Sequence, residues 1–224
     1  MKSNSSLSEK QSSEPIANDV AVETKIQEAD DLPFTELRLD EYTPKKATLK
    51  VALLAIFTAL GPALSISFIW FPYFELMTLT IFIAGIVLGF LYGSAVALLS
   101  ATLYEIISMV AIGPGFVVFP FKLIVYLLIA LIGAFIGKTT PTKTTYFWRF
   151  FLGVTGGLLT VLYDLVVNIG MVLFLELTFT SYFIVLLTGL PVTAAKVGVN
   201  ITLFAFIPDI LNRALSPLLL RVEG

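Results

Sequence analysis

Several ionisable side chains lie in or beside long apolar stretches of the sequence. Among them are Glu75, Glu105, Lys122, Asp164 and Lys196. On insertion scales a charged residue at membrane depth costs at least about 2.5–3.5 kcal/mol, so each one indicates an ion pair, a water-filled cavity or a functional site. Asn168 and Asn200 accompany them as neutral polar groups. Both charge signs together with amides are suited to binding a polar solute.

A second polar group follows at helical spacing after three of these charges. Residues four apart share one face of a helix. The pairs are Lys122 with Tyr126, Asp164 with Asn168, and Lys196 with Asn200. Three polar stripes predict a shared cavity. The alternative is that the acids and lysines only neutralise one another as buried ion pairs that hold the helices together, although paired ions can also line a cavity.

Enzyme chemistry has few suitable residues here. The chain has no Cys and no His, which excludes disulfides, thiolate nucleophiles, Cys/His metal sites and imidazole bases. It shows no phosphate-binding glycine loop and no basic patch suited to nucleic acid. We therefore expect no enzyme activity, no metal and no cofactor, with carboxylate-based membrane chemistry as a minor alternative.

The elements that must position these groups are membrane-spanning helices. The chain is 57% apolar and only 13% charged, against about 45–50% and about 25% in soluble domains. A spanning helix needs roughly 20 mostly apolar residues. Six segments qualify: about 48–67, 75–92, 93–111, 118–137, 149–176 and 189–212. The sequence therefore predicts an all-α integral membrane bundle of six transmembrane helices over residues 45–224.

Residues 1–44 differ from the rest of the chain. They are rich in Ser, Glu and Asp, and they contain no sustained apolar run. Such a segment cannot bury enough surface to offset its ordering entropy. We expect a disordered acidic cytoplasmic tail, and not a signal peptide, because no short apolar region with a cleavage site follows the charges.

The basic residues predict the orientation of the bundle. If the first helix starts inside, the cytoplasmic flanks hold every Lys and Arg of the connecting segments, and the three outer loops hold none. These residues are Lys45, Lys46, Lys50, Lys138, Lys143, Arg149, Arg213 and Arg221. Both termini are then cytoplasmic, in a multi-pass protein of the plasma membrane. Most intramembrane polar groups fall between the outer surface and the midplane, so the cavity should open outward.

Aromatic residues crowd the first outer loop, residues 68–74, which includes Trp70. Their rings could close over a heterocycle as a lid. The alternative is an ordinary belt of interfacial aromatics.

A stripe of alanines follows the first predicted helix. Ala55, Ala59 and Ala63 are four residues apart and share a face. Small residues let another helix approach closely, so the stripe predicts a docking surface. Similar spacing recurs at Gly85 and Gly89, at Gly133 and Gly137, and at Gly153 and Gly157. The alternative for all of these patterns is packing inside the bundle.

Several of these features occur in an order that resembles one transporter family. A basic lead-in precedes the alanine stripe, a short outer loop and a glycine-containing run, and polar residues follow in the later helices. The residues are Lys45-Lys46, Ala55, Ala59, Phe82-Ile-Ala-Gly85-Ile-Val-Leu-Gly89, Tyr92-Gly93, Glu105, Lys196, Asn200 and Pro208. Over residues 45–215 the chain resembles the substrate-binding S components of energy-coupling factor (ECF) vitamin transporters.

The resemblance implies partners and a ligand. Ala55 and Ala59 would contact a transmembrane T component, which two cytoplasmic ATPases drive. A small vitamin or vitamin precursor would bind near the outer surface, at Trp70, Asp164, Asn168, Lys196 and Asn200. The acidic tail is not part of the family core. Nickel and cobalt members use an N-terminal His that is missing here, which argues against a metal substrate.

Two hypotheses follow from the sequence. In the first, the chain captures a small solute and depends on partners for energy, with Glu105 and Lys122 beside the other site residues. In the second, it is a structural or assembly protein of the membrane whose buried charges only pair. Protection of the protein by a solute in a thermal-shift assay distinguishes them.

Overall fold

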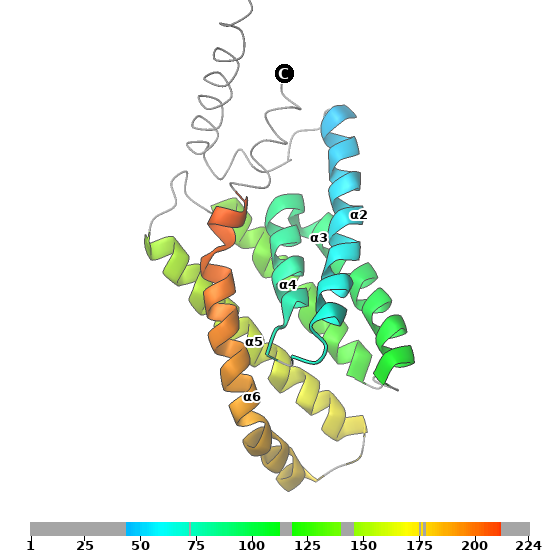
Figure 1. Cartoon of the computed structure of the whole chain (residues 1–224), viewed down its shortest axis with the longest axis vertical. Coiled ribbons are helices and arrows are strands. Elements are labelled where there is room, and N and C mark those ends of the chain that lie inside the picture. The colour runs from blue at the N-terminus through cyan, green and yellow to red at the C-terminus, as the bar shows by residue number, and fades with distance from the viewer. Residues whose placement is uncertain are drawn as a thin grey trace, which may run out of the picture.

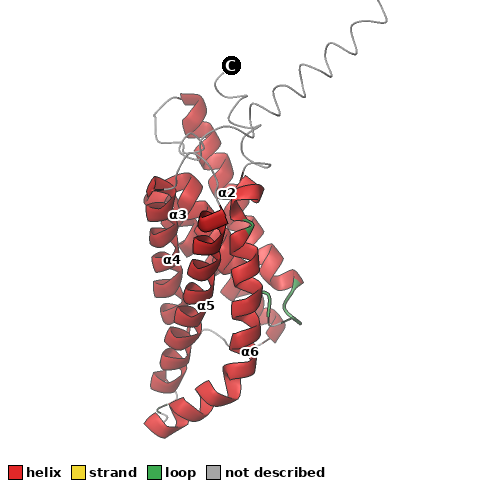
Figure 2. Cartoon of the chain, turned by 90° about the vertical axis from the view of Figure 1, so that its left-hand side faces the viewer, coloured by secondary structure: helices red, strands yellow, loops and turns green. Residues whose placement is uncertain are grey.

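The computed structural model describes residues 44–71, 73–112, 118–139, 146–174, 176 and 178–211. These residues form helices, with a loop described after the first of them, and they contain no strand (Figures 1 and 2). The helices are α2 (Pro44–Ser67), α3 (Leu76–Ile112), α4 (Phe119–Thr139), α5 (Tyr146–Phe174) and α6 (Phe179–Ala205). The predicted tail, apart from Pro44, lies outside the described residues.

All five helices are long and apolar enough to cross a membrane. Together they indicate a multi-pass membrane protein and confirm the all-α class. The predicted segments 48–67, 118–137 and 149–176 correspond to α2, α4 and α5, with ends that differ by a few residues. Hydropathy alone predicts these three helices, because an apolar run in lipid must form a helix to satisfy its backbone hydrogen bonds.

The predicted boundary between the second and third segments is wrong by a few residues. We expected it at Gly93, but the backbone breaks at Gly89, where φ is 77° and ψ is −179°. This region of backbone conformation is open essentially only to glycine. Gly85, Gly89 and Gly93 share the same spacing and the same apolar surroundings, so the sequence does not show which one makes the turn.

The break at Gly89 turns α3 into a helical hairpin. A Cβ placed on Gly93 would lie 2.9 Å from the Cα of Gly85. In a straight helix, residues eight apart are separated by about 12 Å along the axis. The two halves of α3 therefore pack side by side, and α3 begins and ends at the end of the bundle where α2 ends (Figure 1).

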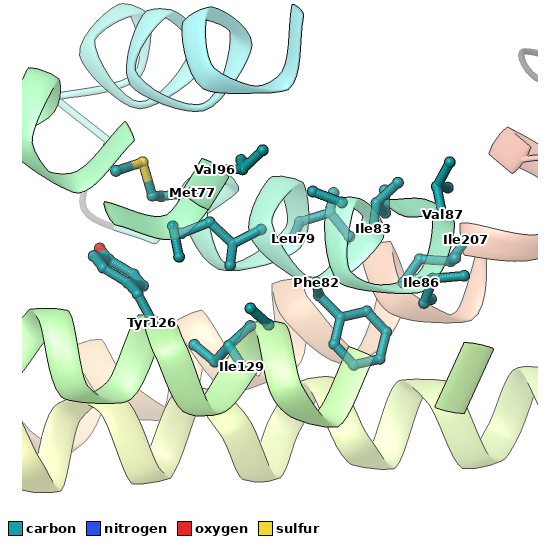
Figure 3. Close-up of a cluster of buried hydrophobic side chains, with 14 of the residues drawn as sticks. Met77, Leu79, Phe82, Ile83, Ile86, Val87, Val96, Tyr126, Ile129 and Ile207 are labelled. Carbon is teal, nitrogen blue, oxygen red and sulfur yellow. The ribbon is translucent and has the colours of Figure 1, made fainter. Parts of the chain in front are cut away.

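The first half of α3 forms the centre of the core. Residues 77–89 are all buried, and Ile81, Phe82 and Ala84 are fully enclosed. Figure 3 shows their side chains leaving the helix in several directions, with Ile129 and Tyr126 of α4 meeting them. A helix that is apolar on every side is stable only when other helices surround it.

Glycines bring α4 against this central segment. A Cβ on Gly133 would lie 2.5 Å from the carbonyl oxygen of Phe82, and one on Gly85 would lie 2.5 Å from that of Ala130. The two backbones are thus in direct contact, as small residues allow in membrane helices. In α5, a Cβ on Gly153 would lie 2.9 Å from the Ile201 carbonyl oxygen of α6, and one on Gly157 would lie 3.0 Å from an Ile201 side-chain carbon. These glycine patterns are therefore internal packing.

The last predicted segment, 189–212, begins too late. Helix α6 starts at Phe179, and Gly189 and Pro191 lie inside it. Thr178 caps its first turn, because the Thr178 hydroxyl accepts a hydrogen bond from the Ser181 amide at 3.4 Å. The predicted segment has Gly189 and Pro191 at its start, but membrane helices tolerate proline in their interior when side chains, waters or neighbouring helices satisfy the freed backbone group.

The helices pack in two groups. Helices α2, α3 and α4 pack closely on one another, while α5 and α6 pack chiefly on each other and more sparingly on the rest. The groups meet where the rings of Phe82 and Phe204 lie 4.8 Å apart between centroids. Charged side chains on both sides of this junction carry the candidate site.

Candidate functional site

A cavity of about 170 Å³ lies where the loop after α2 meets all five described helices. Its lining is aromatic with a few charged groups: Ser65, Phe68, Ile69, Phe71, Phe74, Glu75, Met77, Tyr104, Lys122, Tyr126, Tyr163 and Lys196. Cavities of about 150 Å³ in protein interiors accept a single six-membered ring. The space therefore suits a small molecule of about that size.

The loop after α2 folds across one side of this cavity. Two turns shape it, since the Phe71 amide donates to the Phe68 carbonyl at 2.8 Å and the Phe74 amide donates to the Phe71 carbonyl at 3.1 Å. The rings of Phe68 and Phe74 then pack at 5.3 Å between centroids. Trp70 is 89% exposed and is not part of the lining.

Lys122 enters the cavity from α4 with its charge already paired. Its ammonium group donates a hydrogen bond to the Glu105 carboxylate of α3, and this carboxylate is almost fully buried behind the lining. The hydroxyl of Ser108 also approaches Glu105, at 3.4 Å from Oε2. A buried lysine keeps its charge only when such a partner compensates for lost water.

Lys196 enters from α6 and is paired in the same way. Its Nζ donates to Oδ1 of Asp164 on α5 at 2.8 Å, and the Thr193 hydroxyl donates to the other Asp164 oxygen at 2.5 Å. Both side chains are mostly buried. Each helix group of the bundle thus contributes one lysine to the cavity together with that lysine's own carboxylate.

Glu75 is the third carboxylate near the cavity, and it differs from the other two. It sits in the loop, one residue before the spanning part of α3, and it makes no ion pair with any described residue. Its Oε1 accepts a hydrogen bond from Thr78 at 3.2 Å, while its buried Oε2 has no hydrogen-bond partner. Burial raises the pKa of Glu75 to about 7, and the nearby Lys196 opposes the shift.

Three tyrosines complete the wall. The hydroxyl of Tyr126 on α4 donates to that of Tyr163 on α5 at 3.2 Å, and their rings lie 5.3 Å apart. This contact joins the two helix groups directly beneath the cavity. Tyr104 of α3 places its ring 5.9 Å from the Lys122 ammonium, within the range of a cation–π contact.

The structure gathers only part of the expected site. Lys122 and Lys196 line the cavity, and Glu105 and Asp164 lie behind them as counterions. Asn200 is fully buried away from the lining, where its amide nitrogen donates to Thr160 at 2.7 Å. Asn168 and Trp70 also lie outside the lining.

Four lining residues were not predicted from the sequence: Ser65, Met77, Tyr104 and Tyr163. Each of the two tyrosines directly precedes a charged residue that the sequence analysis names, Glu105 or Asp164. A phenol inside an apolar run carries little penalty, so it gives no signal comparable to that of a buried charge. Adjacency to an intramembrane carboxylate could have drawn attention to both of them.

The cavity lies toward the end of the bundle away from the basic flanks. Lys50, Lys138 and Arg149 belong to the opposite end, near the start of α2, the end of α4 and the start of α5 (Figure 1). The cavity itself is built from the end of α2, the loop after it, and the polar stretches of the other helices.

The side chains at the cavity offer several kinds of contact to a small molecule. The described residues contain no group of His, Cys, Asp and Glu able to hold a metal ion. The two lysines are each engaged by a carboxylate. The aromatic walls offer ring faces for stacking, and Glu75 offers one unengaged oxygen. Comparisons with protein families, with curated proteins and with solved structures give no match to this chain, so the site stands on its own geometry.

Proposed function

We propose that this chain is the substrate-binding S component of an ECF-type importer, which captures a small water-soluble vitamin or related micronutrient from outside the cell. The observation that carries the proposal is the aromatic and charged cavity at one end of the bundle. Ligand sites typically combine mostly apolar walls with a few placed polar groups. The chain shows no nucleotide-binding motif, so energy would come from a T component and two ATPase subunits.

The solute-binding test is a thermal-shift screen of the purified protein against B vitamins and their precursors. A ligand that binds only the folded state raises the free energy of unfolding, by about 2.7 kcal/mol at a concentration 100 times its Kd. The melting temperature rises with it. We expect one chemical class in the panel to stabilise the protein. A uniformly negative screen at millimolar concentrations would contradict the transport proposal.

In the proposed topology, α3 crosses the plasma membrane twice and both termini are cytoplasmic. Two findings support it: the reversal of α3 at Gly89, and the common end of the bundle shared by the start of α2 and the end of α6 (Figure 1). The chain has no native cysteine, so single cysteines can report the orientation. A cysteine at Ser181 should react with a membrane-impermeant reagent from outside, and one at Lys138 should not. The reverse pattern would place the cavity end inside.

The proposed coupling surface is the outward face of α2. Ala55, Ala59 and Ala63 are exposed along it, beside the exposed Ile56 and Leu60. An exposed face of small residues suits close contact with another helix in the membrane. No described helix of this chain covers it.

Ala59→Trp should abolish co-purification with a T component, because a bulky ring holds the two helices apart. Solute binding by the isolated variant should remain unchanged, since Ala59 is outside the cavity lining. Leu187→Trp is the matched control on an exposed position of α6, and it should retain assembly. Loss of solute binding with intact assembly would show that the coupling surface lies elsewhere.

The competing function is a structural or assembly protein of the membrane. One observation favours it: both cavity lysines are already neutralised by carboxylates. On that account the cavity is only a packing defect beneath an interfacial aromatic loop. The screen separates the two functions, because a purely structural protein gains no stability from any solute.

A further inference from the structure

The charges around the cavity do not balance. Three carboxylates, Glu75, Glu105 and Asp164, lie near two ammonium groups, Lys122 and Lys196. Glu105 and Asp164 each take one lysine. Glu75 is left as the surplus negative group, and it lines the cavity.

The surplus carboxylate also has an unsatisfied oxygen. Thr78 donates to Oε1 of Glu75, but Oε2 is buried and receives no hydrogen bond in the described structure. Buried polar atoms without partners are uncommon in folded proteins and need an explanation. A positive charge on a ligand in the cavity compensates electrostatically for the missing partner, because Glu75 lines that cavity.

The walls around Glu75 suit a cation better than an anion. Phe68, Phe71 and Phe74 approach from the loop, and Tyr104, Tyr126 and Tyr163 approach from the helices. Ring faces attract cations through their quadrupole. Lys122 already lies over the Tyr104 ring at 5.9 Å, so the cavity accommodates one cation beside a ring.

We propose that the cavity selects a small organic cation with one aromatic ring, whose positive charge lies near the Glu75 carboxylate and whose ring packs among the aromatic walls. This inference rests on the proposed solute-binding function. An anionic ligand would face the surplus carboxylate, while both lysines are already occupied. A bare metal cation would find mostly ring carbons around it, and these are poor ligands for a metal.

The test compares three single-ring probes of nearly equal shape. 1-Methylnicotinamide is a permanent cation, nicotinamide is neutral, and nicotinate is an anion. We expect 1-methylnicotinamide to bind at least about tenfold more tightly than nicotinamide, and nicotinate to bind most weakly. Binding is measured by isothermal titration with protein in detergent or nanodiscs.

Glu75→Gln is the discriminating variant. It keeps the size of the side chain and an oxygen that can accept from Thr78, but it removes the charge. The preference for the cation over nicotinamide should disappear, because affinity for 1-methylnicotinamide should fall at least about tenfold. The melting temperature of the ligand-free variant shows that it is folded.

The pH dependence of the unmodified protein supplies a second test. The groups that act on Glu75 are Lys196, Asp164, Lys122 and the Thr78 hydroxyl, and the pKa of Glu75 is raised to about 7. Below that pH the carboxyl is neutral and gives a cation no partner. Affinity for 1-methylnicotinamide, whose charge is fixed, should therefore rise about tenfold from pH 6 to pH 8, as the binding-competent fraction rises.

The outcomes distinguish the proposal of cation selection from the proposal of solute binding on which it rests. If nicotinamide or nicotinate binds at least as tightly as the cation, or if the cation preference survives in Glu75→Gln, cation selection is overturned and solute binding stands. If none of the three binds and the vitamin screen is also negative, both proposals fail. If none binds while another, uncharged vitamin does, cation selection alone is overturned.

Discussion

Lys196→Met is expected to lower the stability of the ligand-free protein by about 3–5 kcal/mol, the usual cost of leaving one member of a buried ion pair alone. Within the described part of the chain, the change removes the cation paired with Asp164 and leaves that carboxylate with the Thr193 hydroxyl. Each kcal/mol corresponds to about 2–4 °C in a protein of this size. A fall of at least about 6 °C in melting temperature is therefore expected in detergent.

Two companion variants show whether the loss comes from the stranded charge. Arg149→Met breaks an ion pair of the same 2.8 Å length, to Asp209, but both partners are more than a third exposed. Such pairs contribute about 0–1 kcal/mol, so a small change is expected. Adding Asp164→Leu to Lys196→Met should restore most of the stability, because the unpaired charge is removed. Equal losses of stability in Lys196→Met and Arg149→Met would show that burial does not determine how much these ion pairs contribute to stability.

Gly133→Ala is expected to destabilise the protein by about 1–3 kcal/mol, as overpacking does in a well-packed core. Its new methyl group would lie 2.5 Å from the Phe82 carbonyl oxygen and 3.3 Å from the Phe82 carbonyl carbon. These are backbone atoms, so neither can move aside without shifting α3 relative to α4. The loss should appear as a lower melting temperature, with no change in which helices form.

The same substitution at Gly198 is the matched control. Nothing lies within 4 Å of a Cβ placed there, and alanine is about 0.5–1 kcal/mol better than glycine inside a helix. Gly198→Ala should therefore leave the melting temperature unchanged or raise it slightly. If Gly133→Ala were equally harmless, the close approach of α3 and α4 would be wrong.

The helices were predictable from the sequence because apolar runs in lipid have few alternatives to helix. The ends of the helices were less predictable. Gly189 and Pro191 look like a loop, yet α6 runs through them and starts at the Thr178 cap. The hairpin at Gly89 depends on which of several equally spaced glycines takes a positive φ, and tertiary packing decides that.

The candidate site was predictable in its charges and in the aromatic loop, which supplies Phe68, Phe71 and Phe74 to the lining. A buried charge is costly enough to stand out, so Lys122 and Lys196 could be found, and both line the cavity. Helical spacing shows which residues share a face, but not which face a neighbouring helix covers. Asn200 shares a face with Lys196, yet it turns to Thr160 at a buried position of α5. Loop residues such as Trp70 have no periodicity to orient them.

The most direct test of the central claim is the number of solute molecules bound per protein, with and without the cavity. We expect the most stabilising compound of the vitamin screen to bind with a stoichiometry of one by equilibrium dialysis. Ser65→Phe puts a ring into the cavity from the end of α2, where Ser65 is part of the lining. This variant should bind no solute while its ligand-free melting temperature stays within about 2 °C. Undiminished binding in Ser65→Phe, or no binding to either protein, would contradict the account.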